Sequence, residues 1–460
     1  MRIMGKDNVN MLSGPITKGL LAMTMPIMVM SLLSSLFNVV DMTALKMFGF
    51  ARAVGAVGAC STLITLCTSL LTGTSIGANV TVAKRIGSGN KEQADRAAMT
   101  ALLFSIVGGL VMMVIGIAFA ETFLNWINCP ETLLPQAATY FRLYFLGVPA
   151  IMFHSFSASI LRATGDTKRP FYYSVIGGLT KIVLTVFSAG VLHVGVEGIA
   201  SATIICQLLM DFLFARRLIK FQSAVKIDFR HPVFDFNELK SMLRIGVPTG
   251  VQTALYSFAN TVIATAVNSF GEAATTGISI ANQFDSILYQ IIHAPSLAVM
   301  PFVAQNMGAG NLKRVKATIW RGALITIVFG ATLGSLSASF SSQLSSLMSD
   351  SAEVIAYSRQ KMIIISSTYF ICGINEVLAG VLRGIGKPTI PTISTLLFMC
   401  ALRFVWVYAI FPLIPNLTFL YAVWPIGWVL SIGTILFFFF PTAKQLTYKY
   451  AHPEEFQEAK

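Results

Sequence analysis

The chain has 460 residues, of which 55% are hydrophobic and 12% charged, and its mean hydropathy is +0.71. A soluble protein carries roughly 25% charged residues to keep its surface wetted, so this composition predicts a surface that mostly contacts lipid. The net charge of +13 does not indicate nucleic-acid binding, because the basic residues lie in short loops between apolar runs rather than in one patch. The six cysteines show no metal-ligand spacing, and we expect no disulfide framework, metal or cofactor.

A membrane-spanning helix needs about 20 mostly apolar residues. On that criterion we predict an all-α polytopic membrane protein with twelve transmembrane helices. Their expected positions are 16–40, 53–78, 98–120, 136–161, 171–192, 197–219, 241–267, 276–303, 317–340, 356–381, 389–411 and 419–440. The polar stretch after the sixth helix divides the chain into an N-terminal six-helix lobe (1–221), a cytoplasmic linker (222–240) and a C-terminal six-helix lobe with a short cytoplasmic tail (241–460).

Charge placement predicts how the helices are oriented in the bilayer. The loops after the even-numbered helices are rich in Lys and Arg, whereas the odd-numbered loops are poor in them, with Lys46 and Arg52 as the main exceptions. Basic loops stay on the cytoplasmic side, so both termini are expected in the cytoplasm.

An internal repeat runs through the chain. Val82–Asn90 recurs as Val303–Asn311 and Leu161–Gly165 recurs as Leu382–Gly386, each shifted by 221 residues (87 to 308), and Pro26 and Asn38 recur as Pro248 and Asn260, shifted by 222 (26 to 248). An even number of helices in each half gives both halves the same orientation. We therefore expect two lobes related by a parallel pseudo-two-fold axis, with a central cavity between them.

The repeated loops also carry a resemblance to a known family. Gly87-Ser88-Gly89-Asn90, the Leu-Arg-x-x-Gly loops, and Asn38-Val39-Val40-Asp41 in the first helix resemble the signatures of multidrug and toxic compound extrusion (MATE) transporters, and the likeness covers nearly the whole chain. It implies a secondary active multidrug efflux transporter, not an enzyme, in a bacterial cytoplasmic membrane. Such a transporter would act as a monomer and export organic, often cationic, compounds by antiport with protons or sodium. The resemblance leaves the choice of ion open.

The chain departs from the family pattern at the ion site. Family members commonly carry Asn and Asp four residues apart in the fifth helix, beside the aspartate of the first. Here Lys181 and Thr185 stand at those positions, and the threonine of the sixth helix is retained as Thr203. The resemblance thus implies an ion-coupling site of Asp41, Lys181, Thr185 and Thr203. A lone ammonium near the middle of a membrane helix is costly, so we expect Lys181 to pair with Asp41, either for coupling or as a purely structural ion pair.

Polar side chains of the second lobe are candidates for the substrate cavity. In the family some members carry carboxylates in the seventh and tenth helices, which this chain replaces with Tyr256 and Cys372. Intramembrane carboxylates usually line a cavity, although pairing with Arg403 or with helix-capping groups would also explain Asp285 and Glu376. The predicted cavity residues are Asn38, Gln252, Tyr256, Asp285 and Glu376.

Other features admit more than one interpretation. Pro26 and Pro248 each interrupt a predicted helix and indicate either a hinge or a static kink. Gly73–Gly77 fits the Gly-x-Ser-x-Gly pattern of hydrolases, but inside a membrane helix its Gly-x-x-x-Gly spacing favours close helix packing. Two rival functions remain: a flippase for a lipid-linked precursor on a related fold, and a membrane-embedded enzyme. The enzyme would need clustered His, Asp or Cys residues that the sequence does not offer.

Overall fold

The computed structural model describes residues 8–49, 51–127, 129–220 and 224–451, and the secondary structure of these residues is helical. The chain forms two compact units. Unit 1 comprises the residues up to Asn10 and Pro26–Gly250, and unit 2 comprises Met11–Met25 and the chain from Val251 onward. The unit boundaries therefore fall inside two helices, next to Pro26 and close to Pro248. The predicted lobes 1–221 and 241–460 instead place their boundaries in the linker.

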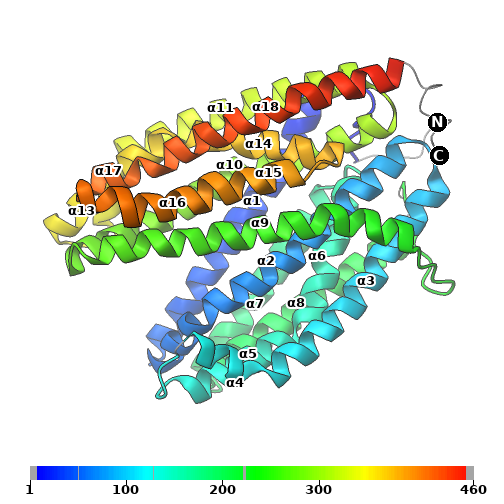
Figure 1. Ribbon diagram of the computed structural model, residues 1–460. Coiled ribbons are helices and arrows are strands. Elements are labelled where there is room, and N and C mark those ends of the chain that lie inside the picture. Colours follow the sequence, from blue (N-terminus) through cyan, green and yellow to red (C-terminus); the bar gives the residue numbers. More distant parts are fainter. Residues whose placement is uncertain (1–7, 50, 128, 221–223, 452–460) are drawn as a thin grey trace. The chain divides into compact units, whose positions relative to one another are not determined.

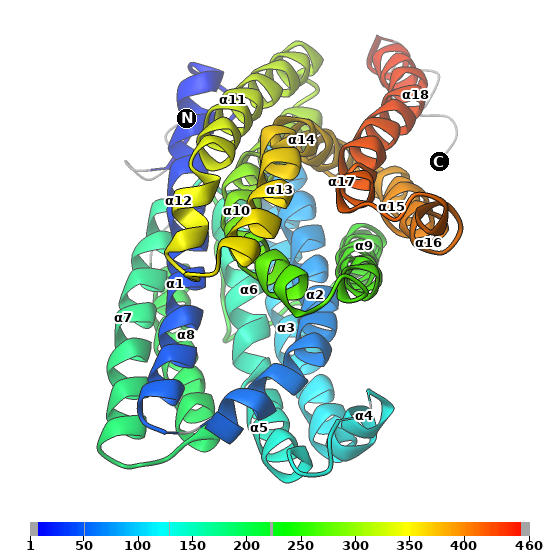
Figure 2. The same cartoon turned by 90° about the vertical axis from the view of Figure 1, so that its left-hand side faces the viewer.

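Unit 1 is a bundle in which sequential helices lie beside one another (Figure 1). It contains α1 (Ile16–Met47) from Pro26 onward, α2 (Ala51–Gly87), α3 (Lys91–Ala118), α4 (Ala120–Trp126), α5 (Leu134–Leu146), α6 (Val148–Ala163), α7 (Lys168–Gly190), α8 (Val196–Lys220) and α9 (Phe236–Asn268) as far as Gly250. Within this unit, α7 lies against α8, and α6 lies against α2 and α3 (Figure 2).

Unit 2 has its apolar core around α10. Besides the start of α1 and the rest of α9, it contains α10 (Glu272–Gly308), α11 (Leu312–Ser339), α12 (Ser341–Ser346), α13 (Ala352–Ser367), α14 (Tyr369–Ile385), α15 (Thr389–Thr395), α16 (Leu402–Val405), α17 (Leu417–Tyr421) and α18 (Val423–Ala451). Helix α10 packs against α11, α13 and α14. The large buried side chains of the core include Leu288, Tyr421 and Trp428.

Most of the long helices are long and apolar enough to cross a membrane, and they follow one another along the chain as predicted from the sequence. Among the described residues, nine helical stretches meet that test alone, and eleven do so if the bent pairs α5–α6 and α13–α14 each count as one span. The pairs are bent by 45° and 47°. Helix α9 is less apolar, but its 33 residues extend about 50 Å, enough to span a bilayer. With α9, the helices correspond in order to the twelve predicted segments.

The repeat has a local physical cause. Asn90 and Asn311 cap the first turns of α3 and α11, where their side chains accept hydrogen bonds from the backbone N–H groups of Gln93 (3.0 Å) and Arg314 (3.1 Å). The glycine before each asparagine has a positive φ, 75° at Gly89 and 71° at Gly310. Glycine adopts that conformation without strain, and asparagine is a favoured N-cap, so the Gly-Asn pair specifies the same turn twice.

The helix of unit 2 that corresponds to α7 of unit 1 is irregular. Helix α7 is a regular α-helix, whereas its counterpart from Thr389 contains π-helical turns at Leu396–Ala401 and Trp406–Ile410, on either side of α16. Such turns are rare and often occur at functional sites. Arg403, in α16 between the two π-helical turns, contacts Tyr256, Asn260 and Trp424, which line the cavity described below.

Close packing of α2 against the first part of α9 explains the Gly73–Gly77 motif. A Cβ atom on Gly77 would lie 2.0 Å from the carbonyl oxygen of Met242, and one on Gly73 would lie 2.2 Å from Cα of Gly250. Gly246 and Gly250 repeat the same four-residue spacing on α9. The helix-packing interpretation of the motif is thus confirmed within unit 1.

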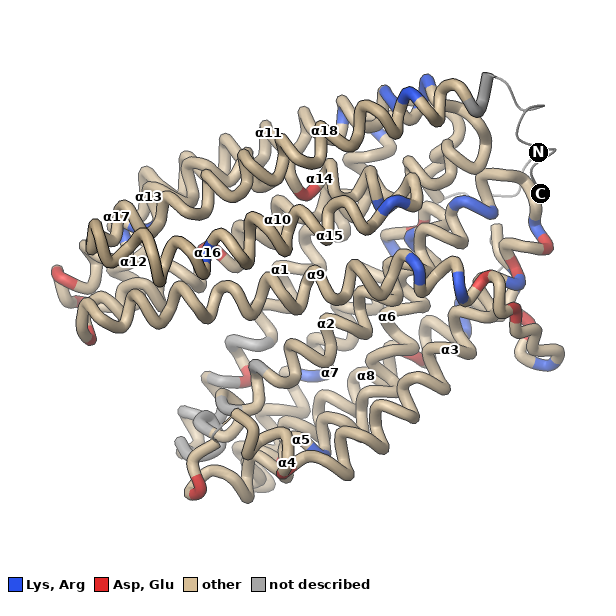
Figure 3. Tube along the Cα trace, viewed as in Figure 1, with Lys and Arg blue, Asp and Glu red and all other residues tan. Residues whose placement is uncertain are grey.

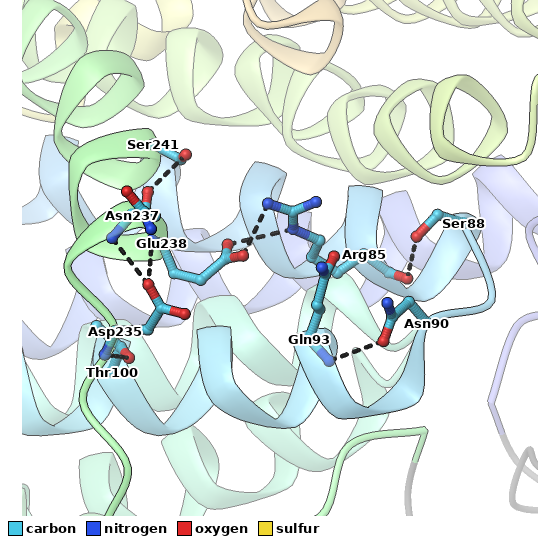
Figure 4. Close-up of polar contacts among 9 residues, drawn as sticks. All are labelled: Arg85, Ser88, Asn90, Gln93, Thr100, Asp235, Asn237, Glu238 and Ser241. Carbon is cyan, nitrogen blue, oxygen red and sulfur yellow. Dashed lines mark hydrogen bonds and ion pairs between the residues drawn. The ribbon is translucent and has the colours of Figure 1, made fainter. Parts of the chain in front are cut away.

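The segment before α9 is attached to α3 and α2 (Figure 4). The backbone N–H of Asp235 donates to Thr100 of α3 (3.0 Å), and the Asp235 carboxylate accepts from the backbone N–H groups of Asn237 and Glu238. Glu238 then pairs with Arg85 of α2 at 2.7 Å. These capping bonds explain why α9 begins at Phe236, a little before the predicted start at 241.

Charged residues avoid the middle of the helices. In Figure 3, Lys and Arg of each unit gather toward one end of its helices, and the middle lengths carry few charges. The few charged residues inside the spans are therefore candidates for a functional role.

Candidate functional site

In unit 1, α1 and α7 bring Asp41 and Lys181 together. The Lys181 Nζ atom lies 2.6 Å from Oδ2 of Asp41, and the Thr185 hydroxyl donates a 3.1 Å hydrogen bond to Oδ1. Lys181 and Thr185 lie one turn apart on α7, so both reach the same carboxylate. The predicted pairing of Lys181 with Asp41 is confirmed.

The ion pair is largely shielded from solvent. The side chains of Asp41 and Lys181 are 9% and 17% exposed, and Thr185 is fully buried. Thr203 of α8 donates its hydroxyl to the backbone of Ile199, and no described contact joins it to Asp41. The side chain of Asn38 lies outside the described residues.

Unit 2 contains a cavity of about 340 Å³. Aromatic rings form much of its wall, together with one carboxylate, one ammonium and several amides and hydroxyls. Its lining includes Tyr256, Asn260, Asn282, Asp285, Tyr289, Lys361, Tyr369, Tyr421 and Trp424. Of the predicted cavity residues in unit 2, Tyr256 and Asp285 therefore line this cavity, and Gln252 and Glu376 are not part of its lining.

The charged residues of the cavity are Asp285 of α10 and Lys361 of α13. Lys361 Nζ lies 2.8 Å from Asp285 Oδ2 and also donates to the side chain of Asn282. The suggested pairing of Asp285 with Arg403 is thus wrong, because the nearer α13 supplies a lysine. Lys361 is a site residue that is not among those predicted from the sequence. Its place inside the predicted tenth helix was the available signal.

Arg403 lies in α16 and is fully buried. Its guanidinium lies 5.1 Å from the centre of the Tyr256 ring and 5.0 Å from that of Trp424, and its Nη1 donates to Asn260 at 2.6 Å. No carboxylate of the described residues lies within ion-pair distance of it. Arg403 follows Lys181 by the repeat shift of 222 residues, so each unit places a cation at the equivalent point of its fifth helix.

Glu376 and Gln252 are held in separate polar networks. Glu376 of α14 accepts a hydrogen bond from the Tyr289 hydroxyl (3.3 Å), and its other oxygen lies 3.6 Å from Nε2 of His293. Gln252 accepts from Arg383 at 3.0 Å and donates to Thr395 at 2.9 Å. Pairing of Glu376 with Arg403 is not observed. Among the described residues, no three His, Cys, Asp or Glu side chains gather as metal ligands.

A family model and several known proteins match this chain over most of its length. A family model described as MatE matches residues 26–187 and again residues 248–409, the same repeat found above. A Bacillus subtilis protein named "Probable multidrug resistance protein YoeA" is 28% identical over 381 residues, covering 81% of this chain and 82% of that protein. A Shewanella oneidensis protein named "FAD transporter" is 25% identical, covering 83% and 85%.

A solved structure with the same fold is also found. It is the outward-facing conformation of a multidrug resistance MATE family transporter of the MOP superfamily, with a TM-score of 0.89, 20% identity, and coverage of 97% of this chain and 99% of that one. At this identity the likeness concerns the fold alone.

Proposed function

Because the chain belongs to the MatE family, the MATE transporters, which are multi-pass membrane proteins and not enzymes, we propose that it exports organic, often cationic, compounds by antiport with protons or sodium. The single observation that carries the coupling part of this proposal is the contact group of Asp41, Lys181 and Thr185. An intramembrane carboxylate that is held by a movable cation can exchange that cation for another.

Asp41, Lys181 and Thr185 would all take part in the exchange of one cation for another. In the described state the Lys181 ammonium occupies the place beside Asp41 where a coupling cation would bind. Protonation of Asp41, or arrival of sodium or a cationic substrate, removes or competes for the negative charge and releases Lys181. Thr185 keeps one carboxylate oxygen oriented while the other exchanges partners. A static ion pair that only holds α1 against α7 would show no such exchange.

The variant Lys181→Ala separates the two roles. We expect efflux of a cationic dye from liposomes to fall by about tenfold, and the pH dependence of the residual activity to shift to higher pH, because protons no longer compete with an ammonium for Asp41. The measurement is dye efflux at a series of pH values. Lys220→Ala, at an exposed position at the end of α8, is the matched control. If Lys181→Ala leaves both the rate and its pH profile unchanged, the coupling role is wrong.

The two prolines at equivalent positions of the repeat, Pro26 in α1 and Pro248 in α9, support a proposed hinge. Pro26 begins unit 1 within α1, and Pro248 precedes the boundary between the units within α9 by only two residues. Each proline removes a backbone hydrogen bond of its helix, which lowers the cost of bending there. We propose that the units move about these points during transport.

We propose a monomer in the cytoplasmic membrane of a bacterium with both termini in the cytoplasm, on the basis of the basic loops. Single cysteines introduced at Lys91 and Glu131, in a background without the native cysteines, should react with a membrane-impermeant maleimide only from the cytoplasmic and only from the outer side, respectively. The opposite labelling would contradict this orientation.

A further inference from the structure

The cavity of unit 2 contains an ion pair that no step proposed above uses. Both members line the cavity, Asp285 from α10 and Lys361 from α13, and their charged atoms lie 2.8 Å apart. Their residues are 8% and 3% exposed. A cavity of about 340 Å³ lies within the range of roughly 300–1,000 Å³ that is usual for small-molecule sites.

The pair has unused hydrogen-bonding capacity. Oδ1 of Asp285 is buried and has no hydrogen-bond partner among the described residues, and neither has the hydroxyl group of Tyr421. Asn260 accepts from Arg403 through its side-chain oxygen, so its amide N–H groups are what it can offer a ligand. The lining therefore presents one strong acceptor together with several donors, and buried polar groups of this kind are normally paired.

The wall between these groups is aromatic. The rings of Tyr256 and Tyr289 are stacked with their centres 6.1 Å apart, and Trp424 lies 5.9 Å from the Lys361 ammonium. Rings in such numbers favour a ligand with a flat apolar body, because offset stacking adds to the free energy of burying its surface.

The Asp285–Lys361 ion pair favours a ligand that leaves neither of the two charges without a partner. A ligand that carried only a positive charge would bring a second cation to the single carboxylate of the cavity lining, and one that carried only a negative charge would bring a second anion to its single ammonium, so in either case one charge lacks a partner of its own. A buried charge without a partner is strongly unfavourable. A ligand with both charges replaces each partner by one of its own, so no charge stays unpaired.

We propose that this cavity binds one exported substrate besides the organic cations, and that this substrate is a small aromatic zwitterion. Its ammonium pairs with Asp285 and uses the free Oδ1 atom. Its carboxylate accepts hydrogen bonds from Lys361 and from the donors of Tyr421 and Asn260. Its ring lies against Tyr256, Tyr289 and Trp424. This inference rests on the proposed function only in treating the bound molecule as cargo.

The test is equilibrium binding of three probes that share one ring system, measured by calorimetry on the purified protein. Tryptophan is the zwitterion, tryptamine lacks the carboxylate, and N-acetyltryptophan lacks the positive charge. We expect tryptophan to bind at least about tenfold more tightly than either analogue, a difference of ~1.4 kcal/mol or more. Equal affinities, tighter binding of an analogue, or no binding of all three would overturn the proposal.

Charge variants should change the order of the three affinities. Lys361→Met leaves an unpaired carboxylate and should make tryptamine the tightest probe, whereas Asp285→Asn should favour N-acetyltryptophan. The double variant with both changes leaves no unpaired charge, guards against misfolding of the single variants, and should bind the three probes alike. Arg142→Met with Glu121→Gln, at an exposed ion pair, is the control that should keep the wild-type order.

A binding assay without ion gradients separates this inference from the proposed coupling site. Asp41→Asn should abolish gradient-driven efflux but leave the three affinities unchanged. If efflux depends on Asp41 and the probes still bind alike in the wild-type protein, the zwitterion site is wrong and the coupling proposal stands. If the probes rank as predicted but Lys181→Ala has no effect on efflux, the reverse holds.

Discussion

Lys181, Lys361 and Arg403 are basic side chains inside the membrane spans, and their charges are stabilised in two different ways. Lys181 and Lys361 each pair with one carboxylate, Asp41 and Asp285. Arg403 has no carboxylate within ion-pair distance among the described residues, and two aromatic faces and one amide oxygen stabilise it instead. A planar guanidinium can stack on two rings while it donates at its edge, which a compact ammonium cannot do.

Replacement of Arg403 by lysine should therefore be destabilising although the charge is kept. We expect Arg403→Lys to lower the stability of the protein by about 1–2 kcal/mol, because the stacking on Tyr256 and Trp424 is lost. The melting temperature of the purified protein reports this change. Arg142→Lys, at the exposed pair with Glu121, should melt like the wild type, and equal melting of the two variants would show that the stacking is unimportant.

At the scale of helices, the sequence predicts the regular parts well and the irregular parts poorly. The turns around Gly89 and Gly310 follow from local residue preferences, and the packing of Gly73 and Gly77 follows from their spacing. The bends within the fourth and tenth predicted helices, and the π-helical turns beside Arg403, were not predicted, because apolar composition is the same in a straight and an irregular helix. Lys361 lies inside the predicted tenth helix, so the criterion that identified Lys181 in the fifth helix could have identified it as well.

The substitution Gly77→Ala, which adds one methyl group, tests the contact between α2 and the first part of α9. Gly77→Ala places a Cβ atom 2.0 Å from the carbonyl oxygen of Met242, so the helices must separate. We expect a loss of about 1–3 kcal/mol, the usual effect of overpacking, seen as a lower melting temperature. Gly433→Ala in α18 is the matched control, since a Cβ atom there meets no neighbour within 4 Å. A variant Gly77→Ala as stable as Gly433→Ala would contradict the close packing.

At the scale of the whole molecule, a repeated scaffold supports two dissimilar sites. The repeat is preserved in the glycine turns, the asparagine caps, the bent helix pairs and the internal prolines. It is lost at the polar sites, where unit 1 has the Asp41–Lys181 pair near Thr185, and unit 2 has an aromatic cavity with the Asp285–Lys361 pair. Such a division suits a transporter that couples at one site and binds cargo at another, because the two sites can then be linked through movement of the units.

Gradient-driven efflux tests the proposed antiport most directly. The purified protein in liposomes loaded with a fluorescent organic cation such as ethidium is exposed to a proton gradient or a sodium gradient, imposed one at a time. We expect at least one of the two gradients to drive export, and we expect the variant Asp41→Asn to lose this export. Export that neither gradient drives, or export that Asp41→Asn leaves unchanged, would contradict it.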